Sequence, residues 1–127
     1  MLEGTGYLAL ATCPSIFEMG VSMARTPEGK FQDALVKSLE DIFTDCLVQK
    51  NDANYRQGVP DLLILFRGKW ALLEVKKSST APHRPNQPYY VDWAKRHSFG
   101  AFVYPENRDE IIKELYDFFF DRNEEKN

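Results

Sequence analysis

The sequence lacks the features that mark several common classes of protein. It has only two cysteines in 127 residues, Cys13 and Cys46, which excludes a framework of several disulfides. These cysteines are not spaced as metal ligands, so we expect reduced, buried thiols. No stretch approaches the roughly 18 apolar residues that a membrane-spanning helix needs. The apolar patch at 7–11 also lacks the preceding basic residues of a signal peptide. We therefore expect an intracellular protein.

Basic residues are also few. The chain has 16 Lys and Arg against 19 Asp and Glu, a formal net charge of −3, which argues against an evenly basic surface. The charge is distributed unevenly, however. Residues 50–97 carry nine basic and four acidic residues, a balance of +5, whereas the segments on either side each have a balance of −4. This pattern predicts a confined basic face that is compatible with a polyanionic substrate.

Apolar residues are present in sufficient number for one core. The hydrophobic fraction is 43% and includes nine Phe, six Tyr and two Trp, and the length suits one domain. Residues 1–22 have few charges and no sustained hydrophobic period. We therefore predict an N-terminal extension or arm over 1–22, a single domain over 23–121 and a charged tail over 122–127.

A first helix is predicted over residues 27–43. Thr26 is a suitable N-cap, and Pro27 suits the first helical position. Glu28 falls on the apolar face of this helix, where a carboxylate needs a partner. The apolar residues that recur at helical spacing are Phe31, Leu35, Leu39 and Ile42.

The remaining pattern predicts three strands, a helix, a strand and a last helix. The second and third strands are expected to form a hairpin with its turn at 67–69, and the strand–helix–strand unit that follows predicts a parallel crossover. The fold class is therefore α/β, with a mixed central sheet flanked by helices and an additional C-terminal helix. The predicted strands span 46–50, 61–66, 70–76 and 100–104, and the predicted later helices span 86–97 and 107–121.

Four charged residues are expected to converge at one end of the hairpin. Asp61 begins one strand, and Glu74 and Lys76 end the other, two residues apart and therefore on the same face. The turn between the strands places Asp61 beside them. Glu28 joins the group if the first helix packs against the sheet. Each motif alone also fits an exposed edge pair or a turn; together they predict a site.

Three carboxylates in a half-buried site repel one another unless a divalent cation lies between them. Hard oxygen ligands suit Mg2+, with Mn2+ as a substitute. Such a metal polarises a phosphodiester and activates water. Lys76 would orient or deprotonate that water, or stabilise the charge that develops on the phosphate. The residues therefore predict metal-assisted phosphodiester hydrolysis.

The segment 58–61, Gly-Val-Pro-Asp, followed after twelve residues by Glu-Val-Lys at 74–76, resembles the PD-(D/E)xK nuclease superfamily. Within it, the chain is most similar to small phage-encoded endonucleases of the VRR-NUC and Holliday-junction-resolvase-like type, from about residue 25 to 107. This resemblance implies a restriction-endonuclease-like core and a Mg2+-dependent DNA endonuclease. Branched DNA is a candidate substrate, and a homodimer is a candidate assembly.

The resemblance also implies roles for individual residues. It makes Lys76 catalytic and gives Gln87, at the start of the second helix, the task of holding water or Lys76. The alternative for Gln87 is a residue that caps backbone groups of its helix. The metal ligands that the resemblance implies are Glu28, Asp61, Glu74 and the backbone carbonyl of Val75.

Further polar residues flank these motifs and are candidate contacts to the DNA backbone, although a solvated surface role fits each of them equally well. They are Lys50, Tyr55, Arg56, Gln57, Lys77, His83 and Arg84. Two other classes of function remain open. One is a catalytically silent DNA-binding or assembly subunit with a nuclease fold, and the other is a small α/β ligand-binding module. The presence of all the acids and the lysine favours the enzyme.

Overall fold

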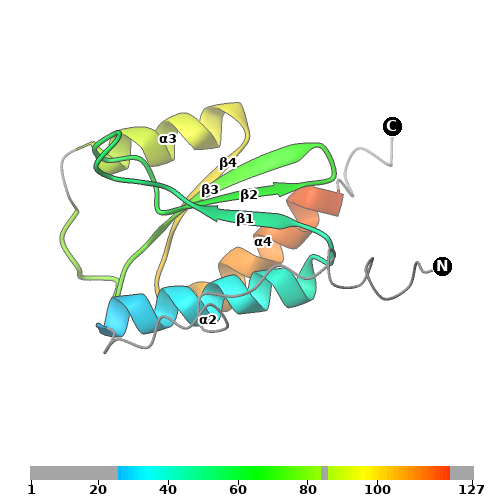
Figure 1. Cartoon of the computed structure of the whole chain (residues 1–127), viewed down its shortest axis with the longest axis horizontal. Coiled ribbons are helices and arrows are strands. Elements are labelled where there is room, and N and C mark those ends of the chain that lie inside the picture. Colours follow the sequence, from blue (N-terminus) through cyan, green and yellow to red (C-terminus); the bar gives the residue numbers. More distant parts are fainter. Residues whose placement is uncertain (1–25, 84–85, 121–127) are drawn as a thin grey trace.

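A computed structural model describes residues 26–83 and 86–120 (Figure 1). The predicted arm over 1–22, the predicted tail over 122–127 and Arg84 lie outside these residues. No helix within 26–83 and 86–120 is long and apolar enough to cross a membrane. The elements, in chain order, are α2 (Pro27–Ile42), β1 (Leu47–Lys50), β2 (Leu62–Phe66), β3 (Lys69–Val75), α3 (Gln87–His97), β4 (Phe99–Val103) and α4 (Arg108–Phe120).

The four strands form one mixed sheet in the order β1-β2-β3-β4. Antiparallel pairing joins β1 to β2 and β2 to β3, and β4 lies parallel to β3. The hairpin turn is tighter than predicted, because Lys69 already pairs with Phe66. Its two residues, Arg67 and Gly68, both have positive φ, as a two-residue turn with the twist of the strands requires. The predicted α/β class and mixed sheet are confirmed.

The helices cover the two faces of the sheet unequally. In Figure 1, α2 and α4 lie on one face and α3 lies on the other, where it connects β3 to β4. The main core is on the face of α2 and α4. Phe43, at the end of α2, is fully buried there, with its ring centroid 5.5 Å from that of Phe66 and 5.2 Å from that of Phe119. An aromatic cluster at the hairpin-turn end therefore holds α2 and α4 to the sheet.

The start of α2 forms as predicted. The side chain of Thr26 accepts a hydrogen bond from the backbone N–H of Gly29 at 3.0 Å, and Pro27 occupies the first turn. The predicted apolar stripe is partly wrong, because Ile42 is 40% exposed. Asp33 is buried instead, and its Oδ1 lies 3.8 Å from Nζ of Lys50 on β1. A charge pair between helix and sheet thus replaces part of the expected apolar contact.

The close approach of β4 to α3 gives a test of the fold. A Cβ on Gly100 would lie 2.5 Å from the carbonyl oxygen of Val91 and 2.6 Å from Cβ of Ala94. We expect Gly100→Ala to lower the free energy of unfolding by about 3 kcal/mol, because the helix must move away. Gly68→Ala is the control: open space surrounds it, and its positive φ costs only about 1 kcal/mol. Equal losses in a denaturant titration would contradict this packing.

Candidate active site

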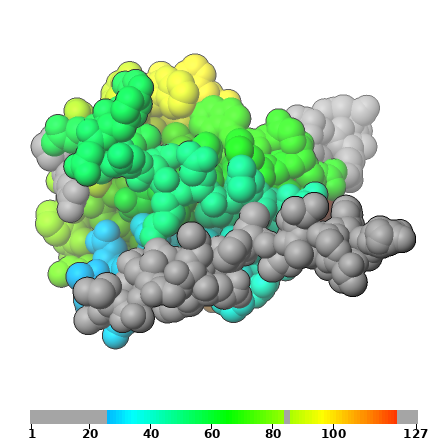
Figure 2. All heavy atoms as spheres, in the orientation of Figure 1, coloured from blue at the N-terminus to red at the C-terminus, as the bar shows by residue number. Residues whose placement is uncertain are grey.

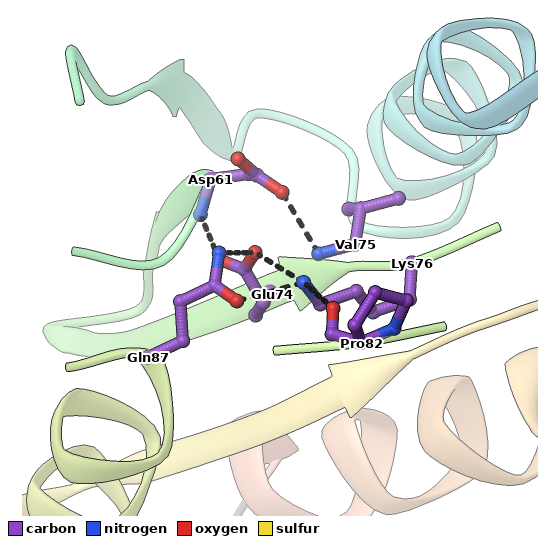
Figure 3. A network of polar contacts seen from close by, with 6 residues as sticks. All are labelled: Asp61, Glu74, Val75, Lys76, Pro82 and Gln87. Carbon is purple, nitrogen blue, oxygen red and sulfur yellow. Dashed lines mark hydrogen bonds and ion pairs between the residues drawn. The ribbon is translucent and has the colours of Figure 1, made fainter. Parts of the chain in front are cut away.

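The hairpin register brings Asp61 and Glu74 together. Leu62 pairs with Leu73, so the residue before β2 lies beside the next residue of β3. The backbone N–H of Asp61 donates a hydrogen bond to Oε1 of Glu74 at 3.2 Å, and the backbone N–H of Val75 donates one to Oδ2 of Asp61 at 3.0 Å (Figure 3). Each carboxylate is therefore held by the backbone of the other strand, as the spacing of the two motifs predicts.

Lys76 and Gln87 complete this network from the end of β3 and the start of α3. Nζ of Lys76 donates to Oε1 of Gln87 at 2.7 Å and to the carbonyl of Pro82 at 3.0 Å, and it lies 3.7 Å from Oε2 of Glu74. Nε2 of Gln87 donates to the same Oε2 (Figure 3). Gln87 thus bridges the lysine and the acid with both ends of its amide, so it does more than cap its helix.

The electrostatics of Glu74 are unusual for a carboxyl group. The residue is only 2% exposed. Burial, together with the charges of Asp61 and Glu28, raises the pKa of Glu74 to about 8, against the opposing effect of Lys76. Loss of water, more than any one neighbour, disfavours its charged form. A carboxyl in this position would gain strongly from a nearby cation, which would favour its charged form.

Glu28 lies on the wall of the cavity that contains this network. It projects from the first turn of α2 and is half-buried. The cavity has a volume of about 720 Å3, and Asp61, Glu74, Lys76 and Gln87 also line it. Among residues 26–83 and 86–120, no three His, Cys, Asp or Glu side chains are grouped closely enough to hold a metal ion in this arrangement. The structure thus joins Asp61 directly to Glu74 by hydrogen bonds, whereas Glu28 lines the same cavity as a separate residue.

The predicted DNA contacts fall into three places. Lys77 and His83 line the same cavity as the acids, and the ring of His83 lies 4.3 Å from that of Phe102. Lys50 does not point to this cavity but pairs with Asp33. The third group is in the loop between β1 and β2, where Tyr55 and Gln57 line a second cavity and the guanidinium of Arg56 lies 5.8 Å from the Tyr55 ring centroid.

Asn51 supports the site, and its role was not predicted. Its Nδ2 donates to the carbonyl of Pro60 at 2.8 Å, and its backbone N–H donates to the carbonyl of Asp61 at 2.8 Å. These bonds tie the first residue of the loop to the last and fix the backbone of Asp61. In the sequence, Asn51 reads only as a turn residue after a strand. Because the two carbonyls that Asn51 bonds lie nine and ten residues further along the chain, no local sequence pattern predicts these bonds.

The order of elements and the position of Asp, Glu and Lys at the shared end of β2 and β3 define a restriction-endonuclease-like fold. Comparison of the sequence with models of known families and with curated proteins gives no match. A solved structure described as "VRR_NUC domain" is similar, with a TM-score of 0.58 and 29% identity. The match covers 70% of this chain and 97% of the other. The predicted resemblance to VRR-NUC nucleases of the PD-(D/E)xK type is thereby confirmed.

The raised pKa of Glu74 makes stability depend on pH. The folded state holds the proton up to about pH 8, whereas an ordinary Glu releases it near 4.5. The contribution of the Glu74 proton to the free energy of unfolding is therefore complete below pH 4.5 and is lost as the pH rises to about 8. Without divalent cations, we expect wild type to lose on the order of a few kcal/mol over this interval relative to Glu74→Gln. Urea titrations at several pH values measure the difference.

The matched control is Glu114→Gln, which changes an exposed carboxyl on α4 in the same way. It should follow the wild-type curve at every pH. If Glu74→Gln also runs parallel to wild type from pH 4.5 to 8, burial does not govern the protonation of Glu74.

Proposed function

We propose that the protein is a Mg2+-dependent endodeoxyribonuclease that hydrolyses phosphodiester bonds. One observation carries the proposal: in a nuclease fold, a buried Glu74 carboxyl is hydrogen-bonded to the backbone of Asp61 and lies 3.7 Å from the ammonium of Lys76. A buried acid with a raised pKa and a charged partner in a cavity is a physical mark of a functional site. A purely structural ion pair would not need the second carboxylate beside it.

The acids suit a hard divalent cation. Asp61, Glu74 and the carbonyl of Val75 would hold it, with Glu28, which lines the same cavity, as a further oxygen ligand. When bound, the cation supplies polarisation of the phosphodiester and activation of water. Mn2+ takes similar ligands and is expected to substitute. The raised pKa of Glu74 supports this assignment, because a positive charge there would offset the repulsion from Asp61 and Glu28.

The protein's own residues would position the reacting groups. Lys76 is 5% exposed, and two acceptors, the Gln87 amide and the Pro82 carbonyl, fix its ammonium. From that position it would orient the attacking water or stabilise charge on the phosphate. Gln87 would hold the side chains of Lys76 and Glu74 in fixed positions relative to each other. Lys77 and His83, on the cavity wall, would contact the DNA backbone.

Mutation of the network tests the chemistry. We expect Asp61→Asn and Lys76→Ala each to lower the cleavage rate at saturating DNA at least about 100-fold, because each removes a group that acts on the reacting atoms. Lys77→Ala is the matched control: the neighbouring lysine is exposed, so its loss should weaken DNA affinity but preserve that rate. Circular dichroism checks the folding of each variant. An Asp61→Asn variant that cuts DNA at near the wild-type rate contradicts the proposal.

The DNA structure is tested separately. We expect Mg2+ or Mn2+ to support cleavage and EDTA to abolish it. Because the chain resembles phage resolvases, which cut two symmetric strands as dimers, a four-way junction is the first branched substrate to compare with linear and flapped DNA. Cutting of the junction alone, by a protein that sediments as a dimer, identifies a resolvase. Binding without any cutting would instead identify a catalytically silent DNA-binding subunit.

A further inference from the structure

A second cavity adjoins the candidate active site. Its volume is about 550 Å3, within the range of small-molecule sites. It shares Asp61 and Gln87 with the first cavity, so the two lie on either side of these residues. Its other walls come from the loop between β1 and β2, which projects from the surface in Figure 2. The walls on that side are formed by Ala53, Asn54, Tyr55, Gln57, Gly58 and Val59.

The chemistry of these walls differs from that of the first cavity. The first has Lys76, Lys77 and His83, which suit phosphate, whereas no Lys or Arg within residues 26–83 and 86–120 lines the second. Two amide side chains of the loop line it instead, from Asn54 and Gln57, and each amide offers both donors and an acceptor. The amide of Gln87, which also lines it, already bonds Lys76 and Glu74. Tyr55 adds a flat ring that is 80% exposed. A planar group with donors and acceptors on its edge fits these walls better than an anion does.

The loop that carries Tyr55 has an ordered, hydrogen-bonded backbone. The backbone N–H groups of Tyr55 and Arg56 both donate to the carbonyl of Asp52, at 3.1 and 3.3 Å, which folds the loop into a compact turn. The guanidinium of Arg56 lies over the Tyr55 ring, 5.8 Å from its centroid. The Tyr90 side chain on α3 is near enough to raise the pKa of the Arg56 guanidinium.

We infer that the second cavity binds one unpaired DNA base next to the phosphate that is cut, with the base stacked on Tyr55 and its edge bonded by the amides. This inference rests on the proposed function and names its substrate class. In a duplex, the bases are stacked and only their groove edges are accessible. A base enters the cavity only from a flap, a gap or a branch point, so the site selects DNA that has an unpaired nucleotide at the cut.

The experiment measures base stacking in the full-length protein without cleavage. A flapped DNA carries 2-aminopurine at its first unpaired nucleotide, and binding is followed by fluorescence in Ca2+ and in EDTA. We expect wild type to quench the probe and to bind flapped DNA more tightly than the matched duplex. Tyr55→Ala should lower the affinity for flapped DNA about tenfold and abolish the quenching, because one stacking contact is lost. Tyr55→Phe should retain both.

Tyr89→Ala is the matched control, because Tyr89 is 57% exposed on α3 and does not line the cavity. It should quench and bind as wild type does. Gln57→Ala should weaken binding to flapped DNA but not to the duplex. Equal affinity of wild type for flapped DNA and duplex, or unchanged quenching in Tyr55→Ala, overturns the inference.

A cleavage assay in Mg2+ separates the two proposals. If the protein cuts DNA but Tyr55→Ala neither weakens binding nor changes quenching, the proposed function stands and the base site is wrong. If Tyr55 governs quenching but no substrate is cut, the base site stands and the nuclease is wrong.

Discussion

The carboxyl group of Glu74 accepts hydrogen bonds from two other parts of the chain while almost no water reaches it. Its partners are the backbone at the start of β2 and the side chain at the start of α3, and the ammonium of Lys76 lies close to it. Burying a carboxyl costs free energy unless each oxygen finds a partner. The hairpin register and the crossover helix must both be in place to provide those partners. Three elements therefore meet around a carboxyl group that is costly to bury.

In this arrangement, the residues that support the site are different from those that we propose to act in it. Asn51 and Gln87 hold Asp61, Glu74 and Lys76 without being acids or bases at neutral pH. Neutral amides thus hold the residues of the proposed site in fixed positions, which is how a protein obtains electrostatic stabilisation without reorganisation. Gln87 lines both cavities, so the same residue connects the two parts of the proposed substrate site.

Most of the fold could be predicted because its signals are local. The helix that begins after Thr26, the apolar hairpin and the crossover follow from capping and periodicity, and the pairing of Asp61 with Glu74 follows from the hairpin alone. What could not be predicted depends on packing between distant segments. Asp33 is an acid on a helix face, and nothing in the sequence shows that Lys50 approaches it. Likewise, the distance of Glu28 from the paired acids depends on how α2 lies on the sheet.

The hydrogen bonds of Asn51 affect which changes in sequence such a domain can accept. They join the two ends of the loop between β1 and β2. The ends are therefore held together by bonds that do not involve the side chains of the residues between them. The entropic cost of lengthening a closed loop grows only slowly with its length. Insertions and substitutions between residues 52 and 59 would therefore leave Asp61 where it is. Exchange of this one loop would then change the walls of the second cavity while Asp61 and Glu74 keep their positions.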